Sequence, residues 1–223
     1  MKELTLEFTS QLKDQLVNNS IKGCLPILEN LEVRAKGYYN FFGESAVPFG
    51  TDDYFSDFML GRFNDVPFFT IKHSLFSRFD KHNLKNPLED LLSSSDYRLL
   101  KKQNTEIKDY GWCGGLTYLP IENIEKEKCS KFALELMTFF LCHSFLTSSP
   151  SGLVVTANLK AKIDHYLIKC GFEAASSPHV IHKELSNNPA QIMILRRPTA
   201  YMTNIYEKYS SYNTNIQTYK KAA

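Results

Sequence analysis

Apolar residues recur at helical spacing in the N-terminal part of this chain. Near-fourfold spacing predicts an amphipathic helix over residues 4–17, with one apolar face made by Leu4, Phe8, Leu12 and Leu16. A second helix is predicted from Pro26, a residue suited to a first turn, to about Tyr39. Residues 54–60 fit a short third helix. We therefore expect residues 1–60 to form a helical extension packed on the rest of the chain.

The central part of the chain changes from an extended pattern to a helical one. Residues 66–71 (VPFFTI) are β-branched and aromatic, which predicts a strand, and Pro67 favours a sheet edge or the start of that strand. Residues 75–103 have helical tendency, with a helix start at Pro87.

The second half alternates between strands and helices. The pattern predicts strands over 112–119, 153–157 and 191–196, and helices over 126–146 and 160–170. Gly171 follows the second helix, where glycine relieves a left-handed cap. From Tyr201 the chain becomes polar, which predicts a surface helix and a frayed tail over 201–223. The fold class is therefore α/β (α+β), with no internal repeat.

Composition indicates a globular protein and narrows the choice of partners. The 223 residues are 43% hydrophobic and 13% aromatic, enough apolar surface for one well-buried domain. Lysine and arginine total 26 against 24 acidic residues, a net charge of +2. This balance does not favour a nucleic-acid partner.

No targeting or membrane-spanning segment is expected. Charged residues interrupt the apolar positions of the first 20 residues, so a signal peptide is not predicted. The longest apolar run, residues 132–146, contains Glu135 and His143 and is too short to span a bilayer. We expect a soluble cytoplasmic protein, with secretion without a cleaved signal left open.

The five cysteines are widely spread and include no CxxC pair. An odd number without such spacing favours neither a disulfide framework nor a structural zinc site. We expect buried thiols and no metal.

One glycine-rich segment stands out. Gly111-Trp112-Cys113-Gly114-Gly115 holds three of the ten glycines and the only tryptophan. Glycines within a strand indicate bulging or close approach of the backbone, which is useful where a ligand lies against a strand.

The order of elements over about residues 111–197 resembles the C-terminal half of the GNAT (GCN5-related N-acetyltransferase-like) acyltransferase fold. The resemblance rests on the strand–helix–strand–helix order, on the turn Lys169-Cys170-Gly171-Phe172, and on the final strand reading IMILRR. It implies a mixed, mostly antiparallel sheet flanked by helices. The implied organisation is the extension at 1–60, a GNAT-like domain at 61–200 and the tail at 201–223.

The resemblance also implies a chemistry. A GNAT enzyme moves an acyl group from acetyl-CoA or a longer acyl-CoA, or from another pantetheine carrier, to an amine on a small molecule or a protein. In that frame the thioester would lie along one strand, with contacts from Gly114, Gly115, Leu116 and Thr117. The pyrophosphate would lie at the N-terminus of the next helix, where unpaired N–H groups favour anions.

The sequence departs from the family at the phosphate loop. The matching span, residues 122–131 (ENIEKEKCSK), contains no glycine. Its cations, Lys126, Lys128 and Lys131, would hold a diphosphate as point charges, although three glutamates offset them. A solvated helix start is the alternative interpretation of this span.

Two further residues have roles implied by the resemblance. The family has a tyrosine four residues before the glycine of the Gly-Phe turn, which protonates the departing thiolate. Here that position is Leu167, and Tyr166 lies one residue earlier. One residue turns a side chain by about 100° on a helix, so Tyr166 could act as this proton donor only if the helix is shifted. Asn158 follows the strand at 153–157 and would contact a ligand, or would cap a turn.

Two other functions stay open. Cys113 could be the nucleophile of a thiol hydrolase or protease, with a histidine base supplied downstream by His165, His179 or His182. The missing glycines would also suit a non-catalytic interaction protein of the same fold.

Overall fold

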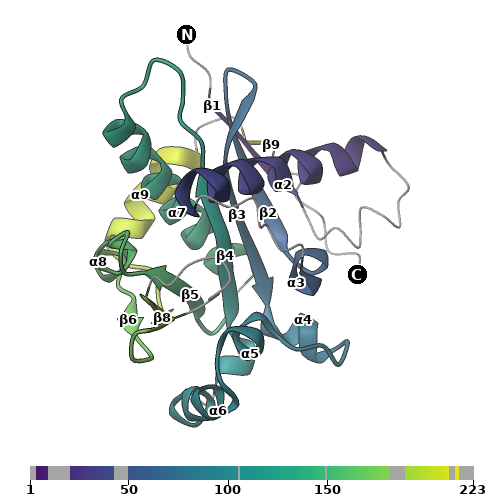
Figure 1. Ribbon diagram of the computed structural model, residues 1–223, viewed down its shortest axis with the longest axis vertical. Coiled ribbons are helices and arrows are strands. Elements are labelled where there is room, and N and C mark those ends of the chain that lie inside the picture. The colour runs from purple at the N-terminus through teal and green to yellow at the C-terminus, as the bar shows by residue number, and fades with distance from the viewer. Residues whose placement is uncertain are drawn as a thin grey trace.

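The computed structural model describes residues 4–9, 21–42, 50–104, 106–148, 150–180, 189–210 and 214–215. Within these residues a single sheet of nine strands has helices on both faces (Figure 1). The strands are β1 (Leu4–Thr9), β2 (Asp57–Phe63), β3 (Val66–Leu75), β4 (Gly111–Tyr118), β5 (Leu153–Asn158), β6 (Glu173–Ala174), β7 (His179–Val180), β8 (Pro189–Leu195) and β9 (Thr214–Asn215). The helices are α2 (Ile21–Phe42), α3 (Thr51–Tyr54), α4 (Phe76–Asp80), α5 (Pro87–Leu91), α6 (Ser94–Gln103), the 3-10 helix η1 (Ile107–Asp109), α7 (Lys126–Ser148), α8 (Ile163–Lys169) and α9 (Ala200–Ser210).

The sheet is mostly antiparallel, as the resemblance implied. Its order is β6-β8-β5-β4-β3-β2-β1-β9, and β7 also pairs with β8. The pairs β4–β5 and β1–β9 are parallel, and the other described pairs are antiparallel. Since β4 and β5 are parallel neighbours, α7 forms the crossover between them.

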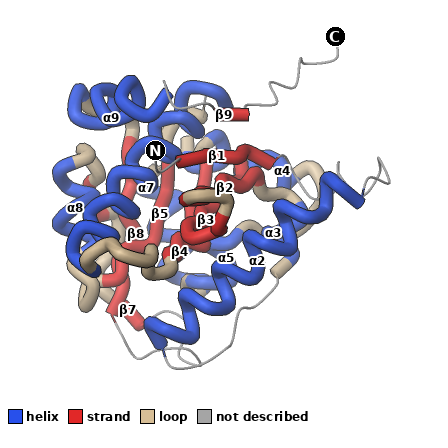
Figure 2. The backbone as a smooth tube through the Cα atoms, turned by 90° about the horizontal axis from the view of Figure 1, so that it is seen from above, coloured by secondary structure: helices blue, strands red, loops and turns tan. Residues whose placement is uncertain are grey.

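The two faces of the sheet have different helices. Helices α7, α8 and α9 cover one face, and α2 lies across the other (Figures 1 and 2). Alternation along β3 illustrates the division, because Phe69 and Ile71 join the α7 core whereas Thr70 and Lys72 face α2 and α3. We refer below to the α7 face and the α2 face.

Helix α7 corresponds to the helix predicted over residues 126–146. Unlike the apolar run 132–146 taken alone, the whole helix is long and apolar enough to cross a membrane by length and composition. Yet many of its side chains are buried within the protein, among them Leu136, Phe139, Phe140 and Leu141. Its apolar character is therefore explained by packing between the sheet and α9.

Two local predictions in the N-terminal region are wrong. Residues 4–9 form β1, which pairs with β2, because Leu4, Leu6 and Phe8 also fit a period of two and together face α7. The remainder of the predicted helix, residues 10–20, lies outside the described residues. The predicted helix at 54–60 is also wrong, since α3 ends at Tyr54 and β2 begins at Asp57.

The other elements agree with the sequence patterns. The helix expected from Pro26 to about Tyr39 is α2, but its predicted start is wrong, because α2 begins at Ile21 and Pro26 lies inside the helix. The second half folds in the predicted order of β4, α7, β5, α8, β8 and α9. Gly171 has a φ of 92° at the end of α8, as its position indicated. Pro67 lies near the start of β3, which is an inner strand of the sheet.

Candidate functional site

Strands β4 and β5 diverge halfway along their length. They pair only over Gly111–Cys113 and Leu153–Val155, and we call the region beyond these residues the fork (Figure 1). The outer edge of β4 stays paired with β3, and that of β5 with β8. Gly114, Gly115 and Leu116 are partly exposed, whereas Cys113 and Val155 at the base are buried. The fork therefore offers unpaired backbone groups of β4 to a ligand.

A β-bulge in β4 accompanies the fork. Lys72 pairs with Gly114 and Thr70 with Thr117, so that Ile71 lies opposite two residues, Gly115 and Leu116. Gly115 has a φ of 63°, a left-handed conformation that strains residues with a Cβ. A bulge bends its strand and increases the local twist. The glycine pair noted in the sequence thus supplies the bend that separates β4 from β5.

Side chains of the α2 face lie directly over this bent backbone. A Cβ atom on Gly114 would collide with the Trp112 ring, and one on Gly115 would lie 3.2 Å from Cγ of Lys72. Further along, Gly37 of α2 packs against the side chain of Thr117. Close approach of other groups is a second reason for glycine at 114 and 115.

A buried ion network holds Lys72 in this position. Its Nζ donates to Oδ1 of Asp53 at 2.7 Å and also pairs with Asp52. Arg34 of α2 donates to Asp53 at 2.5 Å. Burial would raise the pKa of Asp53, but the charges of Lys72 and Arg34 outweigh it and hold that pKa below its usual value. The network joins α2 and α3 to the sheet beside the fork.

The start of α7 carries the three lysines proposed for a diphosphate. Lys126, Lys128 and Lys131 are exposed, and Lys128 pairs with Glu125 at 2.9 Å. Segment 119–125 leads from the fork to this helix start and borders two surface hollows. One, of about 500 Å³, is lined by Ala35, Lys36, Tyr39, Asn40, Leu119 and Pro120. The other, of about 440 Å³, is lined by Phe63, Asn123, Ile124, Glu125, Lys128 and Phe132.

Tyr166 lies on the α7 face, with partners on α7 and α9. Its hydroxyl is 3.0 Å from Oγ1 of Thr138 on α7 and 3.0 Å from the hydroxyl of Tyr201 on α9. Tyr118 at the end of β4 bonds Ser130, and the eight residues from Ser130 to Thr138 advance α7 by about 12 Å. Ser130 therefore lies beside the end of β4, and Thr138 lies about two turns further along α7.

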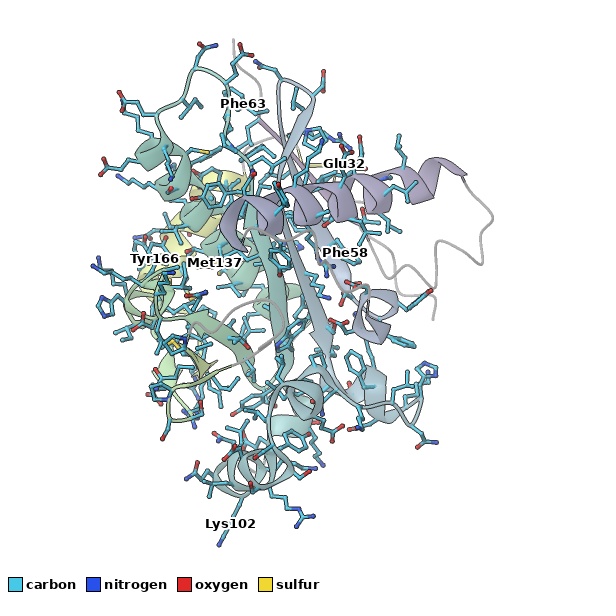
Figure 3. All side chains as sticks on the ribbon, viewed as in Figure 1. Glu32, Phe58, Phe63, Lys102, Met137 and Tyr166 are labelled. Atoms are coloured by element: carbon cyan, nitrogen blue, oxygen red, sulfur yellow. The ribbon has the colours of Figure 1, made fainter. Side chains whose placement is uncertain are left out.

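The environment of Tyr166 keeps its phenol neutral. Burial raises the pKa of Tyr166 well above its usual value, and the neighbouring Tyr201 adds to the increase. Figure 3 shows Tyr166 beside Met137 of α7. Partners from α7 and α9 therefore fix the position of the Tyr166 hydroxyl.

Cys113 and Asn158 have local structural roles in this arrangement. The Cys113 thiol is 3% exposed, and burial raises its pKa far above the usual value. Since the thiolate is the reactive form, this environment argues against the hydrolase alternative. Oδ1 of Asn158 accepts a hydrogen bond from the backbone N–H of Ala161 at 3.1 Å, which is the turn cap predicted as the alternative to ligand contact.

Lys72, Arg34 and Trp112 were not identified from the sequence as neighbours of the fork. These residues come from three elements that only the tertiary fold brings together. A signal for Lys72 exists in the polar alternation of Thr70, Lys72 and Ser74 along β3. That alternation indicates that one face of an inner strand has polar partners.

Solved structures share this architecture at low sequence identity. The AHL synthase LasI superposes with a TM-score of 0.57 and 12% identity, over 87% of this chain and 90% of LasI. FeeM, an N-acyl amino acid synthase from uncultured soil microbes, superposes with a TM-score of 0.57 and 12% identity, over 88% of this chain and 93% of FeeM. BjaI, a CoA-dependent acyl-homoserine lactone synthase solved with SAM and isopentyl-CoA, superposes with a TM-score of 0.56 and 9% identity, over 93% of this chain and 90% of BjaI.

These likenesses establish the fold, which is a divergent GNAT-like fold, as the sequence resemblance implied. No protein-family model matches the sequence, and no curated protein does either.

Proposed function

We propose that this protein is an N-acyltransferase that takes an acyl group from the thioester of CoA, or of another pantetheine carrier, and transfers it to an amine. One observation carries the proposal: within a GNAT-like fold, β4 bends away from β5 at Gly114 and Gly115 and leaves its backbone unpaired. The similar solved structures, among them an N-acyl amino acid synthase and a CoA-dependent synthase, support the same class of reaction.

The thioester is proposed to lie along Gly114–Thr117, with its carbonyl oxygen facing backbone N–H groups of the fork. The amine nitrogen attacks the carbonyl carbon, and the C–S bond breaks as the new C–N bond forms. Fixed N–H donors at the carbonyl oxygen stabilise the negative charge that develops there. The attacking nitrogen releases one proton, and the departing thiolate takes up another.

Tyr166 is the proposed donor of the proton to the thiolate. Its hydroxyl is 3.0 Å from those of Thr138 and Tyr201 on the α7 face, and it is protonated at neutral pH. Removal of a general acid typically costs about 10²–10⁴ in rate. The hydroxyl of Tyr201 is close enough to return a proton to Tyr166 after each turnover.

The phosphates of CoA are proposed to lie beside the start of α7. Lys126 and Lys131 carry exposed positive charges there, and the helix dipole adds a favourable field. The charge of Lys128 is partly neutralised by its ion pair with Glu125. Since the span has no glycine, we expect lysine charges rather than a cradle of backbone N–H groups to hold the phosphates.

Two measurements test this function. Thermal unfolding is followed with CoA, acetyl-CoA and longer acyl-CoAs, and free thiol released from each acyl-CoA is then measured with a panel of amines. We expect stabilisation by acyl-CoA and amine-dependent thiol release. Stabilisation by acyl-CoA, with no thiol released in the presence of any amine, would instead support a non-catalytic binding protein.

A matched comparison tests the placement of the phosphates. Acyl-pantetheine has the thioester arm of acyl-CoA but lacks its diphosphate and nucleotide. Lys126→Glu should weaken binding of acyl-CoA several-fold and leave binding of acyl-pantetheine unchanged. Equal losses for both ligands would contradict the placement at α7.

A further inference from the structure

Trp112 lies at the base of the fork on the α2 face. It pairs with Val154 in the last part of the β4–β5 ladder, one residue before that ladder ends. The benzene edge of its indole leans along the strand onto Gly114, where any Cβ atom would collide with the ring. Gly114 is the first residue of β4 beyond the ladder. The ring therefore lies at the level where the fork opens.

The other side of the ring belongs to an apolar core. Trp112 is 7% exposed and packs in a cluster that includes Leu88, Val154, Ile192 and Ile194. The ammonium of Lys72 lies 5.4 Å from the ring centroid. The indole thus lies between the fork and this apolar core.

Two polar groups at this level lack partners within the described part of the chain. They are the indole N–H of Trp112 and the hydroxyl of Thr156, and both atoms are buried. Thr156 is the first residue of β5 beyond the ladder and shares a sheet face with Val154. Buried polar groups are nearly always hydrogen-bonded, so these two groups, one on each strand, are available to a polar atom of a ligand in the fork.

We infer, on the basis of the proposed function, that Trp112 is the residue that determines acyl-chain length. The paired ladder closes the fork below Cys113, and the indole closes it toward the apolar core. A short acyl group fits above the ring, and its carbonyl oxygen can accept the indole N–H. While the indole ring is present, a longer acyl chain cannot reach the apolar core, and its end stays exposed to water.

The test is kcat/KM for straight-chain acyl-CoAs from acetyl to dodecanoyl with one amine. The wild-type protein should use acetyl and propionyl groups best. Trp112→Leu should move the preferred chain longer by about two methylenes, each methylene contributing about fourfold to kcat/KM. Trp112→Phe keeps most of the bulk, so it should retain the length limit and lose about three- to tenfold at every length.

A matched control separates chain length from stability. Leu88→Ala truncates a buried side chain of the same cluster but away from the fork, so it should lower the melting temperature and leave the length profile unchanged. An unchanged profile in Trp112→Leu would overturn the inference. If that variant does not fold, the wild-type profile decides, because a preference for octanoyl or longer groups also overturns it.

The inference can fail while the proposed function stands. Turnover with a length profile independent of residue 112 removes only the role of Trp112. Absence of turnover and of stabilisation with every acyl-CoA and every acyl-pantetheine removes the proposed function, and the inference with it.

Discussion

The ion network beside the fork gives a sharp test of how α2 and α3 are held to the sheet. Asp53 has a fully buried side chain, and those of Arg34 and Lys72 are each 4% exposed. Asp53→Asn keeps the shape of the side chain but removes the charge that both cations face. Breaking a buried pair by removing one partner costs about 3–5 kcal/mol, because a charge is left uncompensated in the interior.

The expected loss lies at the lower end of that range, at about 3 kcal/mol, because Lys72 keeps Asp52 as a partner. Urea unfolding at pH 7 measures the change in the free energy of unfolding. The exposed pair of Glu32 and Lys36 is the control, since both side chains are about 60% exposed and Glu32→Gln should cost less than about 0.5 kcal/mol. A cost below about 1 kcal/mol for Asp53→Asn would refute the reasoning.

The same network predicts how stability depends on acid. The native pKa of Asp53 lies below its usual value, so its contribution is present above the unfolded pKa of about 3.9. That contribution is lost as the pH falls through the native pKa, and Asp53→Asn should show a smaller acid dependence than the wild-type protein.

Three further predictions concern the fork, the proton donor and a buried histidine. Gly115→Ala, at a φ of 63°, should weaken acyl-CoA binding roughly tenfold in calorimetry. Gly171→Ala, at a φ of 92° and with a Cβ only 2.5 Å from Thr199, should lower stability at least as much but leave acyl-CoA binding unchanged. Tyr166→Phe should lower kcat by about a hundredfold with little change in KM, and a loss below threefold would assign the hydroxyl a structural role only. Burial lowers the pKa of His143 to about 4, so the unfolded chain binds a proton more readily between that value and about 6.5. His143 should therefore lower the free energy of unfolding by about 2–3 kcal/mol between pH 6.5 and 4 in urea titrations. His143→Gln should remove this contribution and leave the one from buried His73, whose pKa is also lowered.

The second half of the fold could be predicted because its local signals agree with one another. The helix at 126–146 is long and apolar, Gly171 ends α8 with a positive φ, and β5 and β8 are short apolar runs. Each pattern there fits one type of element, so propensity and burial lead to the same assignment.

The N-terminal region was predicted wrongly because two periods compete in it. Leu4 and Phe8 fit a helix, while Leu4, Leu6 and Phe8 fit a strand, and pairing with β2 decides between them. A strand that depends on a partner more than fifty residues away cannot be recognised from its own six residues. For the same reason Asp57–Phe63 gave no clear strand signal.

The candidate site was predictable where it depends on backbone and unpredictable where it depends on tertiary contacts. The glycines at 114 and 115 indicated a bulge against a ligand, and the structure has a bulge there. The placement of Lys72 over Gly115, and of the Trp112 ring over Gly114, depends on the register between β3 and β4 and on a rotamer. Neither property is encoded in local composition.

Hydrogen exchange measured by mass spectrometry, with and without saturating acyl-CoA, tests the central claim most directly. If the thioester lies in the fork, the amides of Gly114–Thr117 should become protected together with those at the start of α7. Peptides from α6, which lies away from the fork (Figure 1), should exchange at unchanged rates. Acyl-CoA that stabilises the protein but leaves the exchange of Gly114–Thr117 unchanged would contradict the account.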